Sequence, residues 1–116
     1  MTEAEAKPIG QFIARLQEDG GLKGTDIANV TGVSGATVSR WGSGRKLPHP
    51  KTQLIVSDLS YVVMRLGAYY GREEIRAWLY ARHPQLEGRR AVDLIHDERT
   101  EDVIAILDRL DADAYL

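Results

Sequence analysis

Apolar residues recur at helical spacing along almost the whole chain, and glycine or proline interrupts the pattern at short intervals. No segment alternates apolar and polar residues as a half-buried strand does, and there is no internal repeat or hairpin turn. The pattern predicts an all-α fold without strands. The expected helices of the first half run over residues 8–18, from a Thr25 cap to Gly32 and from a Ser34 cap to Gly42. Those of the second half run over residues 51–69, from Gly71 to a stop at His83-Pro84, and from a Thr100 cap to residue 110. The last residues, Asp111–Leu116, are expected to form a tail.

A proline-rich segment divides the chain into two parts. Pro48 and Pro50 bias the residues before them toward extended geometry, so residues 45–50 are predicted to form a linker. We therefore expect an N-terminal region over residues 1–50 and a C-terminal helical region over residues 51–116. In the C-terminal region the residues predicted to face inward are Leu54, Ile55, Leu59, Val62, Val63, Leu66, Ile75, Trp78 and Leu79, with Arg72, Arg76 and Arg82 facing water.

Residues 25–44 have the pattern of a helix-turn-helix. Ala28 is small where the second helix would cross the first, and Gly32 permits the left-handed conformation of a tight turn. Ser34 is a favourable cap for the second helix, and Val38 is apolar at a position expected between the helices. The segment predicts a DNA-binding motif whose second helix enters a major groove. A plain three-helix bundle with incidental basic residues is the alternative.

The second helix of this motif is the predicted recognition helix. Of the side chains on its outer side, only Arg40 can make a bidentate contact to guanine. Gly35 and Ala36 offer no side-chain hydrogen bonds, so we expect little direct readout of bases and a dependence on dimerisation. Lys51 is placed to meet a phosphate as well. The predicted DNA-binding residues are Lys23, Thr25, Ser34, Gly35, Ala36, Thr37, Ser39, Arg40, Arg45 and Lys46.

The net charge of −2 hides an uneven distribution along the chain. Residues 20–57 contain five basic side chains and a single acidic one, Asp26, whereas residues 91–116 contain eight acidic and two basic side chains. A basic first half fits a polyanionic partner such as DNA. The acidic end fits either a basic partner or a general contribution to solubility.

The C-terminal region shows no arrangement of residues typical of an active site. His83 and His96 are far apart in the sequence, His49 stands alone in the linker and the chain has no cysteine, so no metal site is predicted. Glu73-Glu74 and Asp97-Glu98 are adjacent pairs whose side chains point apart on a helix. We therefore expect no catalytic residues, no bound metal and no cofactor, and we do not expect an enzyme.

Length and composition favour a cytoplasmic homodimer. A chain of 116 residues builds only a modest core, and residues 51–69 offer an apolar stripe that a second copy could cover. The lack of cysteine fits a reducing compartment. The polar residues 1–7 do not resemble a signal peptide, and no apolar run reaches membrane length, so we expect no membrane partner.

Both parts of the sequence resemble known families. The run from Asp26 to Gly44, with its Gly-Val-Ser turn followed by Val-Ser-Arg-Trp and Ser-Gly, resembles the Xre/Cro/repressor class of helix-turn-helix proteins. The order Ile75-Arg-Ala-Trp78-Leu79, Pro84-Gln-Leu86, Gly88-Arg-Arg-Ala-Val-Asp93-Leu94-Ile95, Val103 and Leu107 is similar to the toxin-binding domain of Xre/MbcA/ParS antitoxins. Together these resemblances cover residues 10–116. Ala91 stands where that antitoxin family often has proline, and Glu98 where it often has glycine.

The resemblance implies an antitoxin paired with a RES-domain toxin that consumes NAD. It further implies that the antitoxin covers the mouth of the toxin's active site and binds the operator DNA of its own operon. The acidic end adds a physical argument, because a pocket that binds the pyrophosphate of NAD should be cationic. The predicted toxin-binding residues are Arg90, Asp93, Leu94, Asp111, Asp113, Tyr115 and Leu116, of which the last two would fill apolar space in the toxin's cleft.

Two other functions stay open on the sequence alone. One is a stand-alone helix-turn-helix transcriptional repressor whose second half only dimerises. The other is a partner-binding protein with a vestigial DNA-binding motif, which the small residues Gly35 and Ala36 favour. A chain that copurifies with no toxin would support the first alternative, and a lack of DNA binding at low salt would support the second.

Overall fold

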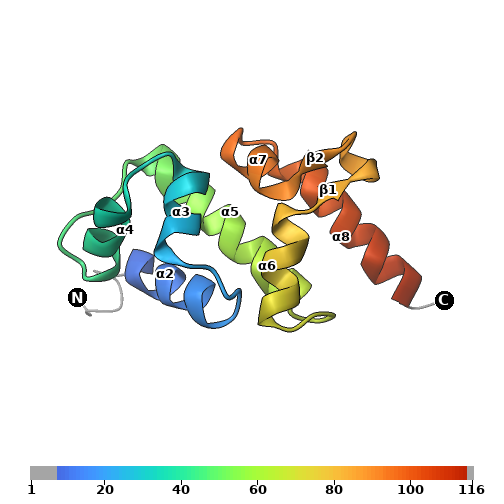
Figure 1. Ribbon diagram of the computed structural model, residues 1–116, viewed down its shortest axis with the longest axis horizontal. Coiled ribbons are helices and arrows are strands. Elements are labelled where there is room, and N and C mark those ends of the chain that lie inside the picture. Colours follow the sequence, from blue (N-terminus) through green and yellow to red (C-terminus); the bar gives the residue numbers. More distant parts are fainter. Residues whose placement is uncertain (1–7, 115–116) are drawn as a thin grey trace.

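A computed structural model describes residues 8–114 and confirms the all-α architecture (Figure 1). The helices are α2 (Pro8–Glu18), α3 (Gly24–Thr31), α4 (Gly35–Gly42), α5 (Pro50–Leu66), α6 (Arg72–Tyr80), α7 (Ala91–His96) and α8 (Thr100–Ala114), with the short elements β1 (Arg82–His83), η1 (Pro84–Leu86) and β2 (Arg89–Arg90) between α6 and α7. The molecule is elongated, with extents of 45 × 26 × 23 Å. Helices α2–α4 lie at one end and α6–α8 at the other, and α5 runs between them.

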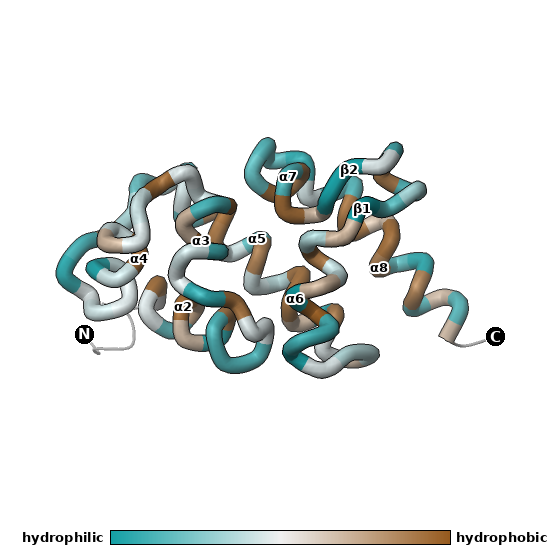
Figure 2. The backbone as a smooth tube through the Cα atoms, viewed as in Figure 1, coloured by the Kyte–Doolittle hydropathy of each residue, from teal (hydrophilic) through white to brown (hydrophobic). Residues whose placement is uncertain are grey.

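The long helix α5 is shared by the two parts of the molecule. It packs against α2 and α3 on the N-terminal side and against α7 and α8 on the C-terminal side. The buried apolar residues therefore form one continuous cluster, and Figure 2 shows hydrophobic residues in helices of both parts of the molecule. The residues between α4 and α5 are non-helical, as Pro48 and Pro50 predict. Within residues 8–114, no helix combines the length and the apolar character that crossing a membrane requires.

Two predictions about α5 are wrong. The helix ends at Leu66 rather than at residue 69, and the side chain of Leu54 is 62% exposed rather than inward. The buried side of α5 is centred on Ile55, Leu59 and Leu66. Leu54 lies about 100° away from Ile55 around the helix axis, so it falls outside that buried side. An apolar residue at one edge of a stripe is not distinguished from an inward one by spacing alone.

The last helix also differs from its prediction. Thr100 is the first residue of α8 rather than its cap, and its hydroxyl donates to Asp58 of α5 over 2.9 Å. The helix continues to Ala114, so the expected tail from Asp111 is helical over Asp111–Ala114. Tyr115 and Leu116 lie outside the described residues. The spacing of apolar residues did not predict this extension, because polar contacts with α5 hold it.

Helix α3 begins in a different way from the one predicted. Lys23, not Thr25, is the capping residue, and the carboxylate of Asp26 accepts a hydrogen bond of 2.8 Å from the backbone N–H of Lys23. This bond satisfies a backbone donor that would otherwise be unpaired at the helix start. The side chain of Thr25 is exposed and caps nothing.

A minimal strand pair contradicts the prediction that the chain has no strands. β1 and β2 are antiparallel, with Arg82 opposite Arg90 and His83 opposite Arg89. The chain reverses through η1 and then through Glu87 and Gly88, whose φ angles are 57° and 79°. Strands of two residues are too short to produce an alternating pattern in the sequence. Helix α6 accordingly ends at Tyr80, before the predicted stop at His83-Pro84.

The two departures from the antitoxin pattern are both compatible with the backbone. Ala91 is the first residue of α7, where proline is favoured but alanine also fits, and it is fully buried. Glu98 has a φ of 61°, which is the left-handed region that favours glycine. Its carboxylate pairs with Lys51 on α5 at 3.1 Å. Glu98 therefore keeps the backbone turn that a glycine would make and adds an ion pair to α5.

A buried carboxylate joins the two ends of the molecule. Asp26 on α3 is 4% exposed and accepts hydrogen bonds from Arg76 Nε and Nη2 on α6, at 3.1 and 3.0 Å. The hydroxyl of Tyr80, also on α6, donates to the same carboxylate at 2.8 Å. Arg76 is exposed, as predicted, and its guanidinium additionally pairs with Asp26. A second contact joins His96 at the end of α7 to the backbone carbonyl of Val30 on α3, over 2.6 Å.

The electrostatics of this junction favour an ionised Asp26. Burial by itself raises the pKa of a carboxyl group, but the hydrogen bonds from Arg76, the backbone of Lys23 and Tyr80 outweigh burial and hold the pKa of Asp26 below its ordinary value. Burial and the bond to Asp26 raise the pKa of Tyr80 to about 12. The hydroxyl of Tyr80 therefore stays protonated and remains a donor at neutral pH.

We predict that Asp26→Asn lowers the free energy of unfolding by about 1–3 kcal/mol at neutral pH, because an amide cannot accept all the donors around it. The pKa of Asp26 is lowered in the folded state, so its contribution is complete above the unfolded-state pKa and is lost as the pH falls through the folded-state value. Urea unfolding between about pH 7 and pH 2 should thus show the variant and the parent converging at acid pH. The control is Asp19→Asn at an exposed position. A difference that stays constant down to the acid limit would contradict this assignment.

Candidate functional site

Helices α3 and α4 are short and joined by a tight turn, which is the arrangement that the predicted motif requires. Gly32 follows α3 with a φ of 77°, and its N–H donates to the carbonyl of Ala28 over 2.8 Å. Ser34 is the cap of α4, as predicted, and its hydroxyl accepts the N–H of Thr37 over 3.1 Å. Val38 and Trp41 on the inner side of α4 are each 2% exposed. The turn and the inner side thus fix which side of α4 faces outward.

The outer side of α4 carries short side chains and one arginine. Gly35, Ala36, Ser39 and Arg40 are exposed, while Thr37 is half-buried and shares its hydroxyl with Ser34 over 3.0 Å. Nothing lies within 4 Å of a Cβ placed on Gly35 or on Gly24, the first residue of α3. Internal packing therefore does not require glycine at either position. Both helix starts are open for a close approach from outside.

Four basic side chains surround this surface without an acidic partner in the described part of the chain. They are Lys23, Arg40, Arg45 and Lys46, all of them exposed. The backbone N–H groups of Arg45 and Lys46 donate to the carbonyl of Arg40, at 2.9 and 3.3 Å. The loop after α4 is thereby folded against the end of that helix, and it appears hydrophilic in Figure 2. Lys51 differs, because it is paired with Glu98.

The one acidic residue of the basic segment does not weaken this positive surface. Asp26 is buried and paired with Arg76 from α6, so its charge is compensated inside the molecule. A hollow of about 310 Å³ lies between α2 and the starts of α3 and α4. It is lined by Gly10, Ile13, Ala14, Gln17, Gly24, Gly35, Val38, Ser39 and Gly42. The predicted DNA-binding residues are therefore brought together at one end of the molecule, with Thr25 exposed beside them and Ser34 in its capping role.

The described partner-binding candidates are spread over β2, α7 and α8. Arg90 and Asp93 form an ion pair with two hydrogen bonds of 2.9 Å, and these bonds lower the pKa of Asp93. The guanidinium of Arg90 also lies 5.7 Å from the ring centroid of Tyr80, next to the Asp26 junction. Leu94 is 2% exposed and belongs to the core. Its predicted contact with a partner therefore stays a prediction, because its side chain is buried within the chain itself.

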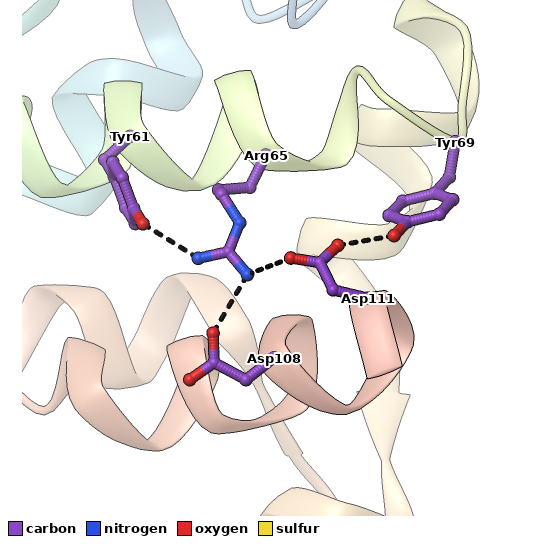
Figure 3. A network of polar contacts seen from close by, with 5 residues as sticks. All are labelled: Tyr61, Arg65, Tyr69, Asp108 and Asp111. Atoms are coloured by element: carbon purple, nitrogen blue, oxygen red, sulfur yellow. Dashed lines mark hydrogen bonds and ion pairs between the residues drawn. The ribbon is translucent and has the colours of Figure 1, made fainter. Parts of the chain in front are cut away.

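The end of α8 contains the remaining candidates. Asp113 is exposed, and Tyr115 and Leu116 lie outside the described residues. Asp111 is held within the chain, because one oxygen accepts from Arg65 at 2.7 Å and the other accepts from the hydroxyl of Tyr69 (Figure 3). A direct contact of Asp111 with a partner would require it to exchange these bonds.

Sequence reasoning missed Arg65 and Arg76 as organising residues. Both are arginines that bind carboxylates more than forty positions away in the chain. Arg65 did carry a signal, since it is a basic residue inside an otherwise apolar stretch of a predicted helix. Asp26 carried one as well, as a lone acidic residue in a basic segment. Neither signal identifies the partner of the side chain.

Comparisons with known proteins agree with this architecture. No protein-family model matches the chain. The mycobacterial cidal antitoxin MbcA of Mycobacterium tuberculosis is 26% identical over 105 residues, which cover 90% of this chain and 89% of the relative, and the protein of the same name from Mycobacterium bovis matches equally. A chain in the "Crystal structure of the M.tuberculosis MbcT-MbcA toxin-antitoxin complex" has the same fold, with a TM-score of 0.76 at 24% identity over 85% of this chain and 89% of that one.

A further relative shares more of its residues with this chain. A probable mycobacterial cidal antitoxin of Mycobacterium tuberculosis is 30% identical over 96 residues, which cover 83% of this chain and 82% of the relative. This match spans more than one structural region, since 96 residues exceed the length of either predicted part. The sequence resemblance to Xre/MbcA/ParS antitoxins is confirmed, and the chain belongs to the family of mycobacterial cidal antitoxins of the MbcA type.

Proposed function

We propose that this antitoxin neutralises a RES-domain toxin that degrades NAD, and that it represses its own operon by binding operator DNA as a homodimer. The observation that carries the proposal is the relationship to mycobacterial cidal antitoxins over 83% of the chain, together with a helix-turn-helix whose outer side is basic. The crystallised relative is described as part of a toxin–antitoxin complex, which supports a toxin as the partner here. The cytoplasm is the compartment in which these activities would take place.

Within residues 8–114, unpaired basic side chains and open helix starts support DNA binding. Lys23, Arg45 and Lys46 have no acidic partner among the described residues, so their charges are available to phosphates. The open space around Gly24 and Gly35 lets the starts of α3 and α4 approach a duplex closely. Readout of bases then falls mainly to Ser39 and Arg40, because the hydroxyl of Thr37 is engaged by Ser34.

We predict that Arg40→Ala weakens operator binding by about 1–3 kcal/mol and relaxes specificity at one base pair. Lys46→Ala should weaken binding to all sequences equally and reduce the slope of affinity against salt by about one unit, because one phosphate contact is lost. Both are measured by fluorescence anisotropy over a salt series. The control is Arg109→Ala, an exposed arginine on α8 that should leave DNA binding unchanged. Equal effects of Arg40→Ala on operator and random DNA would show that Arg40 does not read a base.

Exposed apolar side chains on the outer side of α5 support a homodimer. Leu54, Tyr61 and Met64 are 62%, 41% and 53% exposed and lie at helical spacing on one side of the helix. Exposed apolar side chains aligned along a helix are typical of a contact with another helix. A second copy of the chain is the occupant that the DNA-binding motif favours, since paired half-sites need two motifs related by symmetry.

We predict that the double substitution Leu54→Glu with Met64→Glu converts the dimer to a monomer, because two charges would be placed in its apolar contact. Light scattering over a concentration series measures this change. The matched control is Ala77→Glu on the exposed side of α6, which should leave the dimer intact. A parent chain that is monomeric at every concentration, or a doubly substituted chain that is still dimeric, would refute the proposed interface.

Within residues 8–114, acidic side chains without a basic partner near the end of the chain support a role in neutralising the toxin. Of the eight acidic side chains after residue 90, six are paired with arginine or lysine in the folded chain. The exceptions among the described residues are Glu101 and Asp113, at the two ends of α8. Glu101 is favoured by the positive end of the helix dipole, whereas Asp113 adds charge to the negative end. The end of α8 is therefore the place best suited to enter a cationic NAD pocket.

We predict that deletion of residues 112–116 leaves the fold and DNA binding intact while inhibition of the toxin falls sharply. The removed residues contribute no buried side chain among those described, so thermal stability should change little. Cellular NAD in strains that express the toxin together with each antitoxin variant provides the measurement. The control is Glu101→Ala, which removes the unpaired charge at the other end of α8. Full protection of NAD by the shortened chain would place the inhibitory surface elsewhere.

A further inference from the structure

The last turns of α8 are held to the rest of the molecule by polar contacts. The buried apolar residues of the helix, Val103, Ile106 and Leu107, all lie in its first half. Among residues 108–114, only Leu110 packs against the core, as a half-buried side chain. Residues 108–114 extend for about 10 Å along the helix axis, and Figure 1 shows this end of α8 reaching beyond the neighbouring elements.

One arginine on α5 makes most of these contacts. The Nη2 atom of Arg65 lies 2.9 Å from Asp108 Oδ1 and 2.7 Å from Asp111 Oδ2, so it bridges two carboxylates on successive turns of α8 (Figure 3). Its Nη1 atom donates to the hydroxyl of Tyr61 over 2.8 Å. The hydroxyl of Tyr69, just after α5, donates to the second oxygen of Asp111. The side chain of Arg65 is only 16% exposed, which limits its freedom to move.

The contacts of Arg65 also offset an unfavourable accumulation of negative charge at the C-terminal end of α8. The C-terminal end of a helix carries partial negative charge, and carboxylates there destabilise it. α8 has no basic residue in its last turn, while Asp111 and Asp113 lie in that region. Arg65 supplies the missing positive charge from another helix. Hydrogen bonds from Tyr69 and Arg65 lower the pKa of Asp111, so its carboxylate stays ionised at neutral pH.

We propose that Arg65 is a positioning residue that fixes the direction in which the end of α8 delivers residues 112–116 to the toxin. The inference rests on the proposed function, and specifically on the role of those residues in inhibition. Partly exposed ion pairs add little to global stability, so the main effect of Arg65 is local. Without the bridge, the last two turns would fray and would have to be ordered again during binding, at a cost in affinity.

The test begins with the isolated antitoxin and uses Arg65→Met, which keeps an unbranched apolar stem in place of the arginine's methylene chain and removes its donors. Hydrogen exchange of the amides of residues 108–114 should become faster by about tenfold or more, while exchange in α3 and α4 stays unchanged. The control is Arg99→Met, which removes an arginine just before α8 whose ion pair in the described part of the chain is with Asp102. Unchanged exchange at residues 108–114 in Arg65→Met would overturn the proposal.

The decisive measurement is a double-mutant cycle with a RES-domain toxin that the parent antitoxin inhibits. Arg65→Met should raise the antitoxin concentration for half-inhibition by about 10- to 100-fold and leave operator binding unchanged. In a chain that lacks residues 112–116, the same substitution should cause no further loss, which a merely structural role would not predict. If the shortened chain is weakened and Arg65→Met is not, or if the two losses add in full, the positioning role is refuted. If the shortened chain inhibits as well as the parent, the role proposed for residues 112–116 fails, and the positioning role fails with it.

Discussion

A buried carboxylate surrounded by hydrogen-bond donors joins the two parts of the molecule. Asp26 sits at the first turn of α3, and its oxygens accept hydrogen bonds from its own helix start and from two side chains of α6. A buried charge is stable only when it is paired, and separating α3 from α6 would remove both the ion pair with Arg76 and the hydrogen bond from Tyr80. The proline linker alone would allow many relative orientations of the two parts. Asp26, with the shared helix α5, selects one of them.

Features that depend on neighbouring residues were predictable from the sequence. The left-handed Gly32, the cap at Ser34 and the apolar inner side of α4 each follow from residues within a few positions of one another. The pair of short helices α3 and α4 and the all-α class were therefore predictable from spacing and residue type. The resemblance to an antitoxin family was likewise carried by local motifs, and the relatives confirm it.

Features that depend on distant residues were not predictable in this way. The contacts of Asp26 with Arg76 and of Arg65 with Asp108 and Asp111 join residues more than forty positions apart. Spacing had suggested that Thr25 caps α3 and that the chain after Leu110 is a tail. Both expectations failed because of carboxylates. Asp26 accepts the backbone N–H of Lys23 at the start of α3, and Asp111 binds Arg65 and Tyr69 within the helical end of α8. The DNA-binding candidates are gathered at one end of the fold, while their function, like that of the partner-binding candidates, stays a prediction.

The shared helix α5 also limits how such a protein can change over generations. One side of α5 packs against α2 and α3 and another against α7 and α8, so a gene fusion that exchanged only the first fifty residues would bring in a foreign α2 to meet an unfamiliar α5. The N-terminal and C-terminal parts are therefore not freely interchangeable modules, despite the linker between them. Divergence is easier through the exposed residues of α4 and α8 than through recombination. A lineage of such antitoxins would then inherit its two parts as a unit.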